Sequence, residues 1–159
     1  MIILKPIIGI ISRHSISNGG NNIKVIYSDI VSSIIKSGGI PIGIFNNNIN
    51  DYYNICSGFI FQGGDLIEEE NITILKRLNN DNKPVLAICL GMQEMALSFG
   101  GNIIDIGDMV INMEHGIKVD TNSLLYKIVE SDYIIVNSRH KSIVSNTNLA
   151  ISAINNNEI

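Results

Sequence analysis

One cysteine stands where an apolar run meets a run of helix-forming residues. Cys89 directly follows Val85-Leu-Ala-Ile88 and precedes Leu90-Gly-Met-Gln93. This order predicts a buried strand, a sharp turn and a helix, with the thiol at the turn. A helix N-terminus carries partial positive charge and free N–H groups, which favour the thiolate over the thiol. Cys89 is therefore predicted to be a nucleophile, whereas Cys56, at the entrance of another expected strand, is interpreted as a buried structural thiol.

A nucleophile that attacks a carbonyl needs N–H donors where the oxyanion develops. The backbone N–H of Leu90 is one predicted donor, and the loop at Gly63-Gly64 is expected to supply the other, because glycine lets the backbone approach a ligand closely. The alternative is that these glycines only shape a strand-to-helix turn, and both roles are compatible. Gln93 lies one helical turn beyond Cys89 and is expected to face the same pocket, with a solvated helix position as its alternative.

Composition favours a packed globular protein. At 159 residues, with 45% hydrophobic and 16% charged residues, the chain is expected to form one domain over 1–159. A net charge of −4 without a basic cluster gives no support for nucleic-acid binding. No apolar stretch is long enough to cross a membrane, and two cysteines make no disulfide framework, so a reduced, cytoplasmic location is expected. The scattered His and Cys residues lack ligand spacing, so no metal site is predicted.

Strands and helices are expected to alternate along the first hundred residues. The expected strands are 7–11, 40–45, 57–61 and 85–88, and the expected helices are 22–37, 68–78 and 91–99. Alternation at this spacing predicts an α/β fold with a doubly wound, mainly parallel sheet. Farther along, residues 109–113 and 116–119 are expected to form a hairpin arm, 123–129 a short helix, and 133–136 and 149–154 further strands.

Several motifs resemble those of one known family. Ala87-Ile-Cys-Leu-Gly-Met-Gln93 resembles the nucleophile motif of class I glutamine amidotransferases, and the most similar subgroup is that of the gamma-glutamyl hydrolases, including gamma-glutamyl-GABA hydrolases. Other similar stretches follow in the same order: Lys5-Pro-Ile-Ile-Gly-Ile10, Gly38-Gly-Ile-Pro41, Gln62-Gly-Gly-Asp65, Gly100-Gly-Asn102 and Val136-Asn-Ser-Arg-His140. The resemblance implies a flavodoxin-like fold with a nucleophile elbow. Whether the last strands of that fold are present stays open.

The resemblance also implies an activity and a set of site residues. The implied reaction is hydrolysis of a gamma-glutamyl amide through a thioester on Cys89, with a small-molecule gamma-glutamyl substrate and no cofactor. Gln93 is implied to help hold the glutamyl group. Asn137, Ser138 and His140 are implied to line the active-site cleft and contact the substrate.

The chain departs from this family at the catalytic base. Members place the catalytic His and its acid in a His-Pro-Glu segment on a late strand, and no such tripeptide occurs here. His14 is expected in a loop, and His115 is interpreted as a surface or core residue. His140 is the hypothesised substitute base, because it alone has a motif reason to approach Cys89. A further departure is Leu90, where many members of the subgroup carry Arg, and this weakens inference to a particular gamma-glutamyl substrate.

Three other interpretations stay open. In the first, the chain is a catalytically inactive relative that binds a ligand or a protein. In the second, it is incomplete, or half of a split enzyme whose partner supplies His and Glu. In the third, it is an ammonia-supplying subunit docked to a synthase. Loss of a late strand is expected to expose a sheet edge, which a homodimer contact or a partner chain would then cover.

Overall fold

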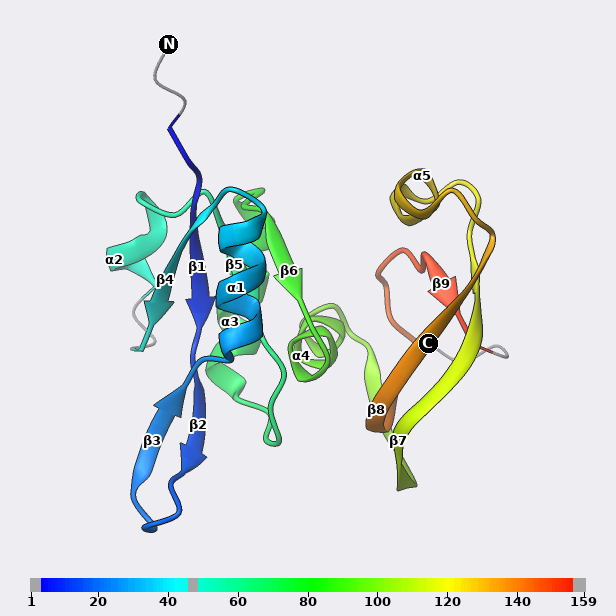
Figure 1. Ribbon diagram of the computed structural model, residues 1–159, viewed down its shortest axis with the longest axis horizontal. Helices are drawn as coiled ribbons and strands as arrows, with labels where there is room; N and C mark the ends of the chain where they lie inside the picture. Colours follow the sequence, from blue (N-terminus) through cyan, green and yellow to red (C-terminus); the bar gives the residue numbers. More distant parts are fainter. Residues whose placement is uncertain (1–3, 46–48, 156–159) are drawn as a thin grey trace. The chain divides into compact units, whose positions relative to one another are not determined.

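A computed structural model describes residues 4–45 and 49–155, with the backbone alone at 108–113. The chain divides into two compact units, Met1–Ser98 and Phe99–Ile159 (Figure 1). Each unit is described by itself below. The expectation of a single domain over 1–159 stays a prediction.

The first unit is built on a four-stranded sheet with the order β4-β1-β5-β6. Its strands are β1 (Ile7–Ile11), β4 (Ile40–Ile44), β5 (Gly58–Phe61) and β6 (Val85–Ala87). All three neighbouring pairs run parallel. The helices between and after them are α1 (Ser28–Lys36), α2 (Asn50–Tyr53), α3 (Glu69–Asn80) and α4 (Leu90–Ser98). This is the doubly wound, mainly parallel sheet that the alternating pattern predicted, with element ends shifted by one or two residues.

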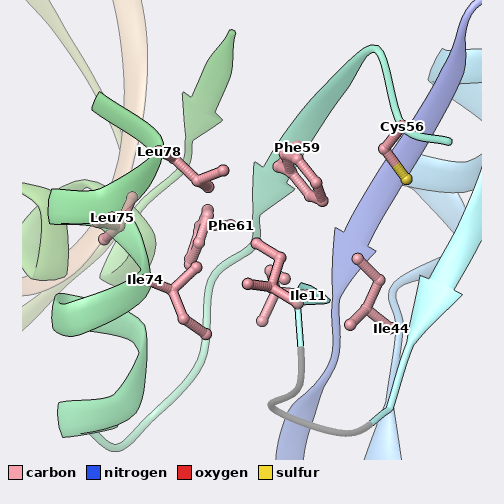
Figure 2. Packing of buried hydrophobic residues seen from close by; sticks show 9 residues of the cluster. Ile11, Ile44, Cys56, Phe59, Phe61, Ile74, Leu75 and Leu78 are labelled. Atoms are coloured by element: carbon pink, nitrogen blue, oxygen red, sulfur yellow. The ribbon is translucent and has the colours of Figure 1, made fainter. Parts of the chain in front are cut away.

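Helices cover both faces of this sheet. Ile10 and Ile11 are neighbours in β1, and their side chains point to opposite faces because side-chain direction alternates along a strand. Ile10 packs with Ile34 of α1 and Ile60 of β5. The opposite face carries a larger cluster that includes α3 (Figure 2): Ile11, Ile44, Phe59, Phe61, Ile74, Leu75 and Leu78. The apolar run at 7–11 is thus covered on both faces, whereas the run before Cys89 lies at the sheet edge, where Leu86 is 56% and Ile88 is 40% exposed.

A hairpin replaces the first part of an expected helix. The helix predicted over 22–37 begins only at Ser28. Residues Asn22–Val25 form β3, which pairs antiparallel with β2 (Arg13–Ile16). Gly20, with φ of +78°, supports the turn between them, since glycine adopts positive φ without steric cost. The prediction of a loop at His14 is wrong for the same reason, because His14 lies on β2.

The second unit contains an antiparallel three-stranded sheet with the order β8-β7-β9. Its strands are β7 (Asn102–Val119), β8 (Tyr133–Ser145) and β9 (Ala153–Ile154). The hairpin expected from 109–113 and 116–119 does not form, because both segments lie in the single long strand β7, which pairs instead with β8. Helix α5 (Leu124–Val129) confirms the short helix, and the Ser123 hydroxyl caps it by accepting the N–H of Tyr126 at 3.0 Å. The strand expected over 133–136 continues to Ser145.

The turn from β6 to α4 is tight. The N–H of Ile88 donates to the Phe61 carbonyl at 2.9 Å, and the N–H of Gly91 donates to the Ile88 carbonyl at 3.0 Å. A Cβ atom at Gly91 would lie 2.3 Å from the Phe61 carbonyl oxygen, so only glycine fits there. Cys89 has a φ of +53°, a left-handed conformation that is costly for a residue with a side chain. The cysteine therefore sits on a strained strand-to-helix turn.

Substitution at Cys89 should reveal this strain. The free energy of unfolding of Cys89→Gly should equal that of Cys89→Ala or exceed it by up to about 1 kcal/mol. The reason is that glycine adopts positive φ freely. Both variants lack the thiol, so the comparison isolates the backbone. Denaturant unfolding followed by circular dichroism measures the difference.

The control is Ala96→Gly in the interior of α4, where glycine should be less stable by about 1 kcal/mol or more, because helix propensity falls and a buried methyl group is lost. A loss of stability in Cys89→Gly relative to Cys89→Ala, of the size seen at Ala96, would contradict a strained turn.

Candidate active site

The predicted nucleophile and the predicted oxyanion loop lie against each other. Cys89 is exposed, at the junction of β6 and α4. A Cβ atom at Gly63 would lie 3.4 Å from Cys89 Cβ and 3.8 Å from Cys89 Sγ. The loop that follows β5 therefore runs directly beside the thiol.

Gly64 lies beside the first residue of α4. A Cβ atom at Gly64 would lie 3.2 Å from Cδ2 of Leu90 and 3.3 Å from both Cγ and Cδ of Arg13. Leu90 opens the helix, so its N–H has no acceptor within α4. The Gly63-Gly64 loop and the start of α4, which are far apart in the chain, thus lie together around the Cys89 thiol. Such an arrangement can supply N–H groups to an oxyanion beside a nucleophile.

A buried ion pair lies beneath this loop. The guanidinium of Arg13 donates to both carboxylate oxygens of Glu94, from Nη1 to Oε1 at 2.6 Å and from Nη2 to Oε2 at 2.8 Å. Arg13 is 2% exposed and Glu94 is 0% exposed. The same guanidinium donates to the carbonyl of Gln62 from Nε at 3.0 Å and from Nη2 at 2.7 Å. Arg13 therefore holds the residue before Gly63 and a residue of α4 at once.

Further polar groups complete this network. Glu94 accepts the N–H of Glu68 at 2.9 Å and the side-chain amide of Asn71 at 3.3 Å. The side-chain amide of Gln62 donates to the carbonyls of Ile11 and Val25 at 3.0 and 2.9 Å. Its oxygen accepts the N–H of the residue before α1 at 2.9 Å. Buried polar groups need such partners, since an unpaired buried charge is costly.

The local sequence pattern did not indicate this network. Arg13 and Glu94 are 81 positions apart, and Arg13 and Gln62 are 49 apart. A charged residue at the end of a buried strand reads as a solvated position, and Glu94 reads as an ordinary helix residue. Neither charge lies near the Gly63-Gly64 loop in the sequence, so no local signal connects the pair to that loop.

The two cysteines differ in their surroundings. Cys56 is 2% exposed within the α3-side cluster, in line with its interpretation as a structural thiol. Burial raises the pKa of the Cys56 thiol above its ordinary value, and the nearby Lys83 ammonium opposes this rise. Cys89 is exposed instead, so it is the thiol available for chemistry.

Gln93 is more enclosed than a solvated helix residue. It is 8% exposed, which excludes the solvated alternative. Its backbone N–H donates to the Cys89 carbonyl at 3.1 Å, in the first turn of α4. Its predicted contact with a glutamyl group stays a prediction.

The remaining predicted residues lie on β8 in the second unit, on two different faces. Ser138 is 8% exposed and His140 is half-buried, whereas Asn137 is exposed. Because side chains alternate along a strand, Ser138 and His140 share one face and Asn137 points from the other. The three residues are therefore divided between the two faces of β8, and their expected contact with one substrate stays a prediction. Cys89 and His140 belong to different units, so their pairing stays a prediction.

His115 has a partner that the sequence did not predict. Its Nε2 lies 2.5 Å from the Ser138 hydroxyl oxygen across the β7–β8 pair. His115 and His140 also line one cavity of about 150 Å³, otherwise walled mostly by aliphatic side chains. The alternation of the two strands brings these polar residues to one face, although His115 was interpreted as an isolated surface or core residue.

Within residues 4–45 and 49–155, no three His, Cys, Asp or Glu side chains gather as metal ligands would. Among the helices of that part of the chain, none has the length and apolar character needed to cross a bilayer. The expectations of no cofactor and of a cytoplasmic location stay predictions.

Similar proteins fall into one group. The chain is 31% identical over 80 residues to a CTP synthase of Staphylococcus haemolyticus (strain JCSC1435). The match covers 49% of this chain and 14% of the synthase, so this chain spans a small part of that relative's length. A putative GMP synthase component of Thermoplasma acidophilum has a similar structure, with a TM-score of 0.72, 17% identity, and coverage of 96% of this chain and 74% of that one.

A glutamine amidotransferase of Thermotoga maritima is also similar in structure, with a TM-score of 0.68, 12% identity, and coverage of 92% of this chain and 65% of that one. At these identities the two structures establish a shared fold. Residues 18–159 match the protein family described as glutamine amidotransferase class-I. The chain therefore belongs to the class I glutamine amidotransferase family.

Proposed function

We propose that this chain hydrolyses the side-chain amide of glutamine or a related gamma-glutamyl amide through a covalent intermediate on Cys89. One observation carries the proposal: an exposed cysteine occupies a strained strand-to-helix turn, with the Gly63-Gly64 loop beside it. Membership of the class I glutamine amidotransferase family supports the same chemistry.

The proposed reaction has two steps. The Cys89 thiolate attacks the gamma-carbonyl carbon, and the tetrahedral oxyanion accepts the N–H groups of Leu90 and Gly64. Collapse breaks the C–N bond; the amine leaves with the proton first taken from the thiol, and a gamma-glutamyl thioester remains. Water then attacks the thioester, which releases glutamate and regenerates the thiol. His140 is the proposed carrier of the proton between thiol and leaving amine.

The identity of the leaving amine separates two finer proposals. A gamma-glutamyl hydrolase cleaves gamma-glutamyl amides whose leaving group is a substituted amine. The motifs at 62–65 and 136–140 resemble those of this subgroup. An ammonia-supplying domain uses glutamine itself and passes the ammonia to a synthase. The second proposal draws support from the similarity to a CTP synthase and to a putative GMP synthase component. A comparison of L-glutamine with gamma-glutamyl-p-nitroanilide as substrates distinguishes them.

Turnover should depend on the Cys89 thiol. Glutamate release from L-glutamine and nitroaniline release from the anilide measure the two activities. Cys89→Ser should lower kcat by on the order of 10³-fold or more, because the hydroxyl is a far weaker nucleophile than the thiolate.

The control is Cys56→Ala, which removes the buried thiol and should leave kcat unchanged. A folded wild-type chain that turns over neither substrate would refute hydrolysis, and would favour the inactive, ligand-binding interpretation.

The proposed base can be tested separately. His140→Ala should lower kcat by about 10²- to 10⁴-fold, the usual loss when a general acid–base group is removed. His14→Ala is the matched control and should retain full activity, because His14 has no proposed role. Initial rates with L-glutamine measure both variants. Unchanged turnover in His140→Ala would exclude His140 as the base.

The two thiols should differ in reactivity in the native protein. Iodoacetamide at neutral pH should alkylate Cys89 and spare Cys56, because Cys56 is enclosed and burial raises the pKa of its thiol. Peptide mass spectrometry measures the labelling of each residue, and the unfolded chain, in which both should react, provides the control. Equal labelling rates in the native protein would contradict the described burial.

A further inference from the structure

Arg13 joins the two segments that surround the nucleophile. Its guanidinium donates twice to the Gln62 carbonyl and twice to the Glu94 carboxylate. Gln62 immediately precedes Gly63 in the loop, and Glu94 lies in α4, five positions after Cys89. One planar group therefore fixes the distance between the loop and the helix.

The aliphatic part of Arg13 adds a steric contact to this polar one. Its Cγ and Cδ atoms would each lie 3.3 Å from a Cβ atom at Gly64, while Leu90 Cδ2 would lie 3.2 Å away from it. Gly64 is thus enclosed between Arg13 and the first residue of α4. A side chain at position 64 would therefore press on both Arg13 and Leu90.

Arginine suits this arrangement better than lysine does. Its guanidinium presents N–H groups in a fixed plane, so it can satisfy a carboxylate on one edge and a carbonyl on another. A lysine ammonium is a single point of charge and cannot hold both groups in fixed geometry. Buried ion pairs are often no more stabilising than well-packed apolar residues of similar volume. Stability alone therefore does not explain a charged pair at this place.

We propose that Arg13 is a positioning residue that sets the oxyanion loop at its working distance from Cys89, acting through Gln62 and Glu94. This inference rests on the proposed function, in which the two oxyanion donors come from Gly64 of the loop and Leu90 of α4. Such donors stabilise the oxyanion only when their spacing is fixed beforehand. A shift of about 1 Å in a catalytic arrangement can cost about 10²-fold in rate.

The test compares two reactions of the same thiol. Arg13→Lys should lower kcat for L-glutamine by about 10- to 100-fold and change KM by less than about threefold, because the lost contacts act mainly in the transition state. The rate of Cys89 alkylation by iodoacetamide should stay unchanged, because that displacement forms no oxyanion. Arg77→Lys, the same change at an exposed arginine, should alter neither reaction.

A second comparison separates positioning from stability. Arg13→Met alone leaves Glu94 as an unpaired buried charge and should lower the midpoint of urea unfolding. Adding Glu94→Met should recover part of that midpoint, because the uncompensated charge is then absent, although the Gln62 carbonyl and the Asn71 amide still lack their partners. It should not restore kcat. Recovery of kcat together with stability, an unchanged kcat in Arg13→Lys, or an equal fall in turnover and alkylation would each overturn the proposal.

A wild-type chain without turnover would refute the proposed function, and the placement of the loop would then be measured directly. Amide hydrogen exchange by mass spectrometry would compare peptides over 61–66 and over α4 in wild type and Arg13→Lys. Faster exchange confined to 61–66 supports positioning by Arg13. Unchanged exchange there overturns it.

Discussion

The buried contact between Arg13 and Glu94 is the interaction on which the arrangement of the first unit depends. It links four segments: the start of β2, the loop after β5, the residue before α3 and the middle of α4. The nucleophile turn lies at the end of the sheet, where this contact adds polar links to the apolar packing that α3 and Met95 of α4 make in the core. Removing two charges from water is expensive, and only a complete set of partners offsets that cost. The partners are present here in the form of Gln62, Glu68 and Asn71. Removing any one partner should therefore destabilise the network, since the remaining groups are left buried and unsatisfied.

Local pattern was enough to predict the chemistry-bearing turn but not what supports it. The apolar run before Cys89 and the helix formers after it specify strand, turn and helix within about ten residues. Secondary structure that is set by neighbouring residues can be predicted from such a pattern. The β2–β3 hairpin escaped prediction because Ile23 and Ile26, upstream of α1, continue the helical spacing that Ile30 begins within it. The strand after Val136 escaped because Asn137, Arg139 and Lys141 face solvent and break the apolar run. Contacts between residues 49 to 81 positions apart leave no local trace at all.

In the second unit, the residues of one contiguous motif divide between the two faces of a strand. Val136-Asn-Ser-Arg-His140 reads as one functional segment, yet it lies on a strand whose side chains alternate between two faces. Ser138 and His140 fall with His115 on the half-buried face, and Asn137 falls on the exposed one. Family resemblance identifies which residues recur together in a sequence. The period of the strand decides which face each residue occupies, and it places Ser138 and His140 beside His115 and Asn137 on the opposite face.

The hairpin that carries Arg13 is anchored at its base and free at its tip. The base of the hairpin contains the Arg13 guanidinium and the Val25 carbonyl, which accepts a hydrogen bond from the Gln62 side-chain amide. Residues 17–20 of the turn are half-buried or exposed. Exposed turns tolerate insertion and sequence change far better than packed strands do. A lineage of such proteins can therefore lengthen, shorten or decorate this turn to meet new neighbours while the geometry around the thiol stays constant. The exposed turn and the buried base of one short hairpin can therefore change at different rates.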